Sequence, residues 1–270
     1  MTIYALRRLL PCPIFAVIAI VLALLAASAT APAQTRKRPP AAKSAPTPAA
    51  PVKVAEGKYE LHKIGGKADR TFEEPWTLYR THLGYELKEH WLVGAGPSST
   101  EPNVIDVSVD FVPGLHPLNI RIGLSAENSL QCSLELTVFS CKSQGLEASL
   151  PMQGIYDFYS PSPWMMGSIA RRAQKVPDQI TQVQLVRVGG MNEAGPKLFS
   201  FKAEVQYVGE DQIEVSGQRF SASIFELKSP HAIPPVMVWI SSEGIVLSIQ
   251  DSTKQEQRMD LVEFKKYGKF

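Results

Sequence analysis

The chain has 270 residues, with 28 lysines and arginines against 26 aspartates and glutamates, and a formal net charge of +2 at pH 7. Residues 1–53 contain basic residues but no aspartate or glutamate. Residues 54–270 therefore hold 21 basic and 26 acidic side chains. A net charge of about −5 there argues against a nucleic-acid-binding surface on the folded part.

The N-terminal segment has the pattern of a secretory signal peptide. Arg7 and Arg8 precede an apolar run over residues 14–27 and then small residues up to Ala33. This predicts a signal peptide over residues 1–33 with cleavage after Ala33. The apolar run is short for a membrane span of roughly 20 residues. We therefore expect an exported protein, periplasmic or extracellular, which stays membrane-anchored only if the segment is not removed.

Residues 34–53, QTRKRPPAAKSAPTPAAPVK, are rich in proline and alanine and show no periodicity. This composition predicts an extended, disordered linker. Its basic side chains can touch an anionic membrane weakly, although a solvated linker needs no partner. The remaining residues 54–270 are long enough for one domain with a substantial core.

The first half of this domain predicts several strands. Residues 57–67, GKYELHKIGGK, indicate a strand and a glycine turn, and residues 77–93 indicate one or two strands around Gly84. Residues 103–112, NVIDVSVDFV, form another strand pattern. The stretches LNIRIGL and SLQCSLELTVF flank a turn at residues 126–128 and predict a hairpin.

Cys132 and Cys141 are the cysteines that remain after signal cleavage, an even number in an oxidising compartment. A disulfide would need a turn near Leu136 and Thr137, neither of which favours turns. The apolar alternation from Leu130 to Val138 instead favours one continuous strand, which would separate the two sulfurs. A disulfide and two free buried thiols both stay open.

One segment departs from the strand pattern. Ser162 followed by Pro163 is a helix start, with Ser162 as the predicted N-cap. The surrounding residues 156–169, YDFYSPSPWMMGSI, hold the densest aromatic and methionine cluster of the mature chain. Two interpretations follow. The helix plugs the open side of a curved sheet, or it forms a lid over an apolar ligand cavity.

The second half predicts an antiparallel meander of about five strands. The run from Lys197 to Tyr207 alternates between apolar and polar residues, and the next turn is expected at Gly209–Asp211. Residues 220–224 alternate again. In PVMVWI, Val236 and Val238 face one way while Met237 and Trp239 face the other. Turns at residues 242–244 and 251–254 separate the last strands. The fold class is mainly β: a curved antiparallel sheet or unclosed β-barrel wrapped around one short helix.

Sequence motifs for common chemistries are missing. There is no Gly-x-Ser-x-Gly, and the run from Gly94 has Ser99 where a dinucleotide loop needs its third glycine. The five histidines form no His-Glu-x-x-His. Glu73 and Glu74 are adjacent, so on a strand they point to opposite faces and do not form an acid–base pair. We expect no catalytic residue, no metal site and no cofactor, and hence a non-enzymatic protein.

The second half also resembles a known family. VQYVGEDQIEVSGQRFSASIFEL, VMVWISSEGIVLSIQ and QRMDLVEF resemble the closing region of an uncharacterised domain-of-unknown-function family of secreted bacterial β-proteins. The matching positions are Tyr207, Gly209, Glu210, Val215, Gly217, Phe220, Ala222, Trp239 and Leu261. The family's usual Pro and Ala before the glycine are absent here, and the middle third of the chain does not match. Such proteins are similar in fold to lipoprotein-localisation carriers of the bacterial envelope. The resemblance implies a hydrophobic cavity between sheet and helix that can hold acyl chains.

Two functional hypotheses follow. The first is an envelope protein that binds an apolar ligand, such as a lipid or a lipoprotein acyl chain. The expected contact residues are Phe158, Tyr159, Trp164, Met165, Ile169, Met237 and Trp239. The alternative is a structural or interaction protein with a filled core, which acts through surface contacts with envelope partners. An internal apolar cavity of about 300 Å³ or more would favour the first hypothesis, and a filled core the second.

Overall fold

A computed structural model describes residues 50–63, 68–93, 103–123, 129–229, 233–253 and 257–269. The predicted signal peptide and most of the predicted linker lie outside these residues, as do the turns expected at residues 64–67 and 126–128. Within the described ranges, none of the helices combines the length and the apolar character that crossing a membrane requires.

The described residues form fifteen strands and one helix, α2. The strands of the first half are β1 Val52–Lys63, β2 Ala68–Arg80, β3 Tyr85–Val93, β4 Asn103–Val112, β5 His116–Gly123, β6 Ser129–Leu134, β7 Val138–Ser143 and β8 Leu146–Pro151. After these come β9 Tyr156–Phe158, α2 Pro163–Ala170, β10 Ile180–Asn192, β11 Gly195–Val215, β12 Gln218–Ser229, β13 Ile233–Ser241, β14 Val246–Asp251 and β15 Gln257–Lys266.

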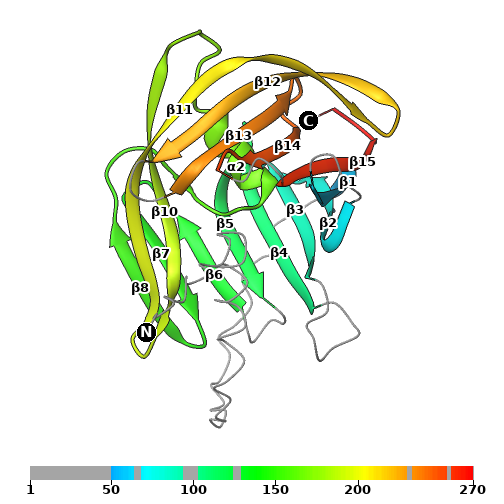
Figure 1. Cartoon of the computed structure of the whole chain (residues 1–270). Coiled ribbons are helices and arrows are strands. Elements are labelled where there is room, and N and C mark those ends of the chain that lie inside the picture. The colour runs from blue at the N-terminus through cyan, green and yellow to red at the C-terminus, as the bar shows by residue number, and fades with distance from the viewer. Residues whose placement is uncertain are drawn as a thin grey trace, which may run out of the picture.

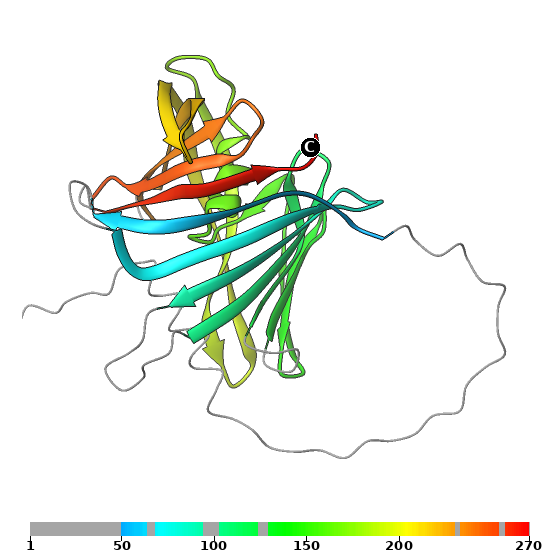
Figure 2. The ribbon, with the colours of Figure 1, turned by 90° about the vertical axis from the view of Figure 1, so that its right-hand side faces the viewer.

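All fifteen strands belong to one strongly curved sheet (Figures 1 and 2). The order is β8-β7-β6-β5-β4-β3-β2-β1-β15-β14-β13-β12-β11-β10-β9. The strands thus follow the chain in both halves, and the antiparallel pairing of β1 with β15 joins the halves. The two sheet edges, β8 and β9, are consecutive in the sequence. The sheet is therefore an unclosed barrel, and its break lies immediately before α2.

Alternation along the strands decides which face is buried. On β4, Val107, Val109 and Phe111 are buried, while Ser108 between them is half-buried and Asp110 is exposed. This period of two is what a sheet with one apolar and one solvated face requires. The mainly β, unclosed architecture predicted from the sequence is the one observed.

The expected turn at Gly209–Asp211 is wrong. Strand β11 runs without interruption from Gly195 to Val215, and a register shift between Tyr207 and Gly209 absorbs the glycine as a bulge. The chain reverses at Ser216 and Gly217 instead, where φ is 51° and 77°. Two successive positive φ values match the twist of a two-residue hairpin, and Gly217 supplies one of them without steric cost.

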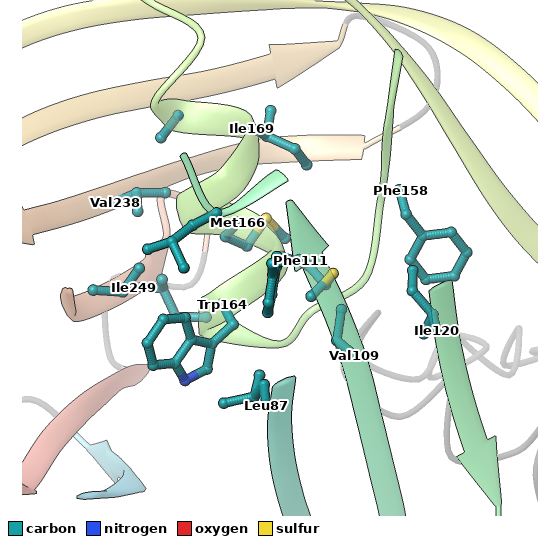
Figure 3. Close-up of a cluster of buried hydrophobic side chains, with 14 of the residues drawn as sticks. Leu87, Val109, Phe111, Ile120, Phe158, Trp164, Met166, Ile169, Val238 and Ile249 are labelled. Atoms are coloured by element: carbon teal, nitrogen blue, oxygen red, sulfur yellow. The ribbon is translucent and has the colours of Figure 1, made fainter. Parts of the chain in front are cut away.

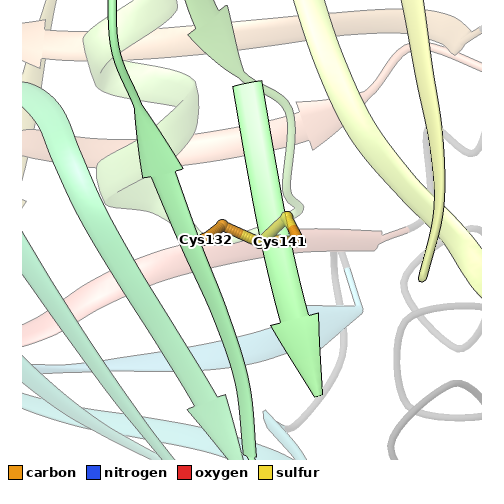
Figure 4. The surroundings of a disulfide bond; sticks show 2 residues. All are labelled: Cys132 and Cys141. Atoms are coloured by element: carbon orange, nitrogen blue, oxygen red, sulfur yellow. A yellow bond between two sulfur atoms is a disulfide. The ribbon is translucent and has the colours of Figure 1, made fainter. Parts of the chain in front are cut away.

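Cys132 and Cys141 are joined by a disulfide across the β6–β7 hairpin (Figure 4). They sit opposite each other in the strand register. The expectation of one continuous strand is therefore wrong. The chain turns over residues 135–137, where the amide of Glu135 donates to the carbonyl of Val138 at 3.0 Å. The apolar residues Leu136 and Val138 extend the even-numbered pattern of β6 and so conceal the turn, although Leu136 is exposed and the buried positions of β7 are the odd-numbered Phe139 and Cys141.

Helix α2 lies on the concave side of the sheet (Figure 1). All eight of its residues are buried, and it packs on β14, β13, β12, β5 and β9. Gly167 allows this close approach: a Cβ at this position would lie 2.4 Å from Val246 Cγ2 on β14. The helix is thus inserted between the two halves of the sheet rather than laid over an outer face.

Candidate functional site

Four of the seven predicted contact residues lie together around α2. Trp164, Met165 and Ile169 of the helix and Phe158 of β9 are buried in the main hydrophobic core (Figure 3). Tyr159 follows β9 and is half-buried, with its ring edge-on to Phe201 at a centroid distance of 5.8 Å. The sequence cluster therefore forms one continuous group in space.

Met237 and Trp239 lie elsewhere. Val238 of β13 points to the helix beside Met166 (Figure 3). Because side chains alternate along a strand, Met237 and Trp239 lie on the opposite face of the sheet. These two residues therefore do not share a site with Trp164, contrary to their expected place in the lining of one cavity.

The helix side chains pack inside the concave side of the sheet. Trp164 is fully buried, packs edge-on against Trp76 with ring centroids 4.9 Å apart, and lies near Phe111 at 6.3 Å. The indole Nε1 atoms of Trp76 and Trp164 are buried and have no hydrogen-bond partner among the described residues. The helix thus occupies this part of the concave side, where two indole N–H groups have no partner among the described residues.

The N-terminal end of α2 meets two buried carboxyl groups. Glu74 of β2 and Glu89 of β3 are each 1% exposed and hydrogen-bond to each other. Ser162 Oγ lies 3.1 Å from Glu89 Oε1 and 3.4 Å from Glu74 Oε1. Trp91 Nε1 donates to Glu89 Oε2 at 3.3 Å. The predicted N-cap residue therefore makes no side-chain bond to its own helix.

Burial controls the protonation of this pair. Removal from water raises the pKa of Glu89 to about 7 and raises the pKa of Glu74 well above its ordinary value, with the neighbouring Glu89 charge adding to the effect on Glu74. A hydrogen bond between two carboxyl groups requires a proton on at least one of them. The pair is consequently a proton-sharing site near neutral pH.

The C-terminal end of α2 is held by a second polar group. Asp157 of β9 is 2% exposed, and Arg172 donates to it through Nε at 2.6 Å and Nη2 at 3.1 Å. Ser168 of the helix donates to Asp157 Oδ1 at 3.2 Å. Arg171 donates to the carbonyl oxygens of Gly244 at 2.7 Å and Leu115 at 3.2 Å. The helix end is therefore tied to β9 and to the turns before β5 and β14.

Ser168, His116 and Asp157 form a constellation that superficially resembles a hydrolase triad. His116 Nδ1 lies 3.4 Å from Ser168 Oγ and 3.8 Å from Asp157 Oδ1. A catalytic triad uses both imidazole nitrogens, one for the serine and one for the carboxylate. Here both contacts converge on Nδ1, and Ser168 is fully buried. The arrangement anchors the helix and does not activate a nucleophile.

A hollow of about 440 Å³ lies on the other face of the sheet, over β4 to β8. Its lining is mainly polar and includes Ser108, Asp110, Asn119, Arg121, Gln131, Ser133, Ser140, Lys142 and Glu147. None of the seven predicted contact residues lines it. This hollow carries charges of both signs and is not a site for an acyl chain.

Sequence reasoning missed the two carboxyl groups at the helix start. Glu74 and its neighbour Glu73 point to opposite faces, as their adjacent positions on a strand predict. The partner is Glu89 on the next strand, where Trp76 pairs with Glu89 in the register. An apolar strand pattern with a glutamate at an inward position was the available signal.

Fold and site together define an unclosed, mainly antiparallel β-barrel with an internal helix, in which only the edge strand β9 pairs in parallel, with β10, among the described strands. The chain is similar to a beta-barrel-like protein of a domain of unknown function, DUF1849, from Brucella abortus, with 12% identity over 81% of this chain and 100% of that chain and a TM-score of 0.46. It is also similar to a DUF1089 family protein from Pseudomonas aeruginosa, with 13% identity, 64% and 87% coverage and a TM-score of 0.40. No family model and no curated protein matches the chain.

Proposed function

We propose that this chain is an exported, non-enzymatic envelope protein that binds an apolar ligand, such as a lipid or acyl chain, on the concave side of its open barrel. The observation that supports this proposal best is the place of α2. An eight-residue, fully buried helix occupies the inside of a sheet that is not closed. In the ligand-free form, α2 fills the space that the ligand would take.

The groups that contact both ends of α2 support the idea that a ligand can displace the helix. Both of its ends rest on buried ionisable groups, Glu74 and Glu89 at one end and Asp157 at the other. A permanent core element is held at lower cost by apolar side chains, because burying charged groups requires desolvation. Burial also raises the pKa values of Glu74 and Glu89, and groups with strongly shifted pKa values concentrate at functional sites.

A filled core acting through surface contacts is the second candidate function. It is favoured by the complete burial of Trp164 and by the polar hollow on the outer face. Under this alternative α2 never leaves the sheet, and envelope partners bind outside. The two candidates differ in one measurable property, the uptake of an acyl chain.

Binding of a fluorescent fatty acid to the purified full-length chain tests the proposal. Wild-type protein is expected to take up about one acyl chain per molecule. Trp164→Ala/Met165→Ala is expected to bind at least tenfold more tightly, because two large side chains no longer compete for the space. Met237→Ala/Trp239→Ala is the matched control, since it removes similar side chains from the opposite face.

Two results would contradict the proposal. If neither the wild type nor Trp164→Ala/Met165→Ala takes up fatty acid or phospholipid, the core is permanently filled and the second candidate is supported. If the Met237→Ala/Trp239→Ala variant alone changes uptake, the apolar site lies on the outer face of β13. Native mass spectrometry with organic extraction identifies the lipid that co-purifies.

A further inference from the structure

We infer that Glu74, Glu89 and Ser162 form a proton-dependent latch: a proton shared by the two carboxyl groups keeps α2 inside the sheet, and loss of that proton releases the start of the helix. The inference rests on the proposed function in taking α2 as the occupant of the ligand space. It adds how the release of that occupant is controlled.

Strand geometry places the two carboxyl groups together. Trp76 on β2 pairs with Glu89 on β3, and Glu74 lies two residues before Trp76 on the same face. Glu73 points to the opposite face, where Lys58 Nζ lies 4.0 Å from its Oε2. Only one of two adjacent glutamates therefore reaches the inside, which gives a matched control residue on the same strand.

The residue that joins the pair to the helix is Ser162. A serine before a helix ordinarily accepts a hydrogen bond from an amide of the first turn. Here its hydroxyl bonds to Glu89 at 3.1 Å instead, and no side-chain cap is formed. The hydroxyl has a single proton, so the second carboxyl group must be satisfied by the proton shared with Glu89. The start of the helix thus depends on the protonation state of the pair.

The described surroundings of the pair offer no positive charge to compensate a second negative charge. The groups that face the pair are Tyr59 of β1, whose Oη donates to the Val246 carbonyl at 2.9 Å, and Trp91 of β3. Val107 of β4 lies opposite Glu89. Arg171 faces Tyr59 and bonds to backbone carbonyl oxygens. Among the side chains that the structure describes, no lysine, arginine or histidine is hydrogen-bonded or ion-paired to either carboxyl group.

At alkaline pH the two carboxyl groups therefore lose their shared proton and both become negatively charged. Burial raises the pKa of Glu89 to about 7 and raises the pKa of Glu74 well above the ordinary value, so the shared proton is held near neutrality. Once both groups are ionised, two like charges face each other in apolar surroundings. Movement of Ser162 and the first turn of α2 relieves this repulsion, because it lets water reach the carboxylates.

Hydrogen exchange on the full-length chain, followed by mass spectrometry between pH 6 and pH 9, tests the latch. Rates are corrected for the intrinsic pH dependence of chemical exchange. We expect protection in peptides covering residues 159–172 to fall at least tenfold over this range, while peptides from β4 keep theirs. Glu74→Gln/Glu89→Gln should abolish this pH dependence, and Glu73→Gln should retain it.

If the double variant does not fold, Glu89→Gln alone serves, because it leaves one ionisable group and removes the repulsion. Protection of residues 159–172 that does not change with pH would overturn the inference, as would an equal loss in β4. Fatty-acid uptake separates the two proposals. If the protein takes up fatty acid but its hydrogen exchange does not depend on pH, the latch is refuted and ligand binding stands. With pH-dependent exchange but no uptake at pH 6 or pH 9, the latch stands and ligand binding fails.

Discussion

Ser162 Oγ lies 3.1 Å from Glu89 Oε1, which joins the residue before α2 to a strand 73 positions earlier in the chain. This contact replaces the local helix cap that the sequence predicts. The start of the helix is consequently stabilised by tertiary structure rather than by its own first turn. The same contact makes the stability of the fold depend on the protonation of two carboxyl groups.

Stability is expected to decrease as the pH rises. Folding raises the pKa of Glu89 to about 7 and that of Glu74 above its ordinary value, so the folded protein holds protons that the unfolded chain has released. This stabilisation is complete below the unfolded pKa of about 4.3 and is lost through pH 7 and above. The free energy of unfolding should fall by up to about 1.4 kcal/mol per pH unit for each proton retained.

Urea denaturation of wild type and Glu89→Gln from pH 5 to pH 9 measures this effect. The variant should show a flatter pH profile and should gain stability relative to wild type as the pH rises. Glu73→Gln should follow the wild-type profile. Parallel profiles for wild type and Glu89→Gln would show that Glu89 does not take up a proton on folding.

Mutation of Arg172 should destabilise the protein more than mutation of its partner Asp157. Arg172→Gln leaves the buried Asp157 carboxylate without its charged partner and is expected to cost about 3–5 kcal/mol. Asp157→Asn should cost less, because the Arg172 side chain is 21% exposed and can remain hydrated. Chemical denaturation of both single variants and of the double variant gives the coupling free energy. Equal costs for the two single variants would contradict this account.

Gly167 permits the contact between α2 and β14. Gly167→Ala should destabilise the protein by about 1–3 kcal/mol, because the new methyl group would lie 2.4 Å from Val246 Cγ2. The helix propensity of alanine offsets only about 1 kcal/mol of this loss. Adding Val246→Ala removes the clash, so the double variant should lose less than the sum of the single variants. Thermal unfolding of all three variants checks this expectation.

The Cys132–Cys141 disulfide closes a loop with a sequence separation of 9. Replacing both cysteines with serine should lower the free energy of unfolding by about 2–3 kcal/mol, because the unfolded chain gains conformational freedom. The hairpin itself should persist, since it also has its ladder of backbone hydrogen bonds. Urea midpoints of the oxidised protein, the reduced protein and the serine variant provide the test. No change on reduction would show that the bond adds no stability.

The alternation of apolar and polar residues predicted most of the strands. Residues 103–112 show a period of two that places Val107 and Val109 inside, and β4 is observed there. Pro163 after Ser162 likewise marked the start of α2 correctly, because proline is suited to the first turn. Turns were harder to place. Gly209 reads as a turn but lies inside β11, since a bulge absorbs a glycine as readily as a turn does.

The candidate site depended on distant contacts. The sequence by itself determined the mainly β class, helix α2 and the aromatic cluster around Trp164, because periodicity and composition are local properties. Only the tertiary structure decided that Glu74 and Glu89 meet, that Ser162 turns to them and that Met237 lies on the other face from the helix. Strand register sets these relationships, and register depends on pairing between segments far apart in the chain.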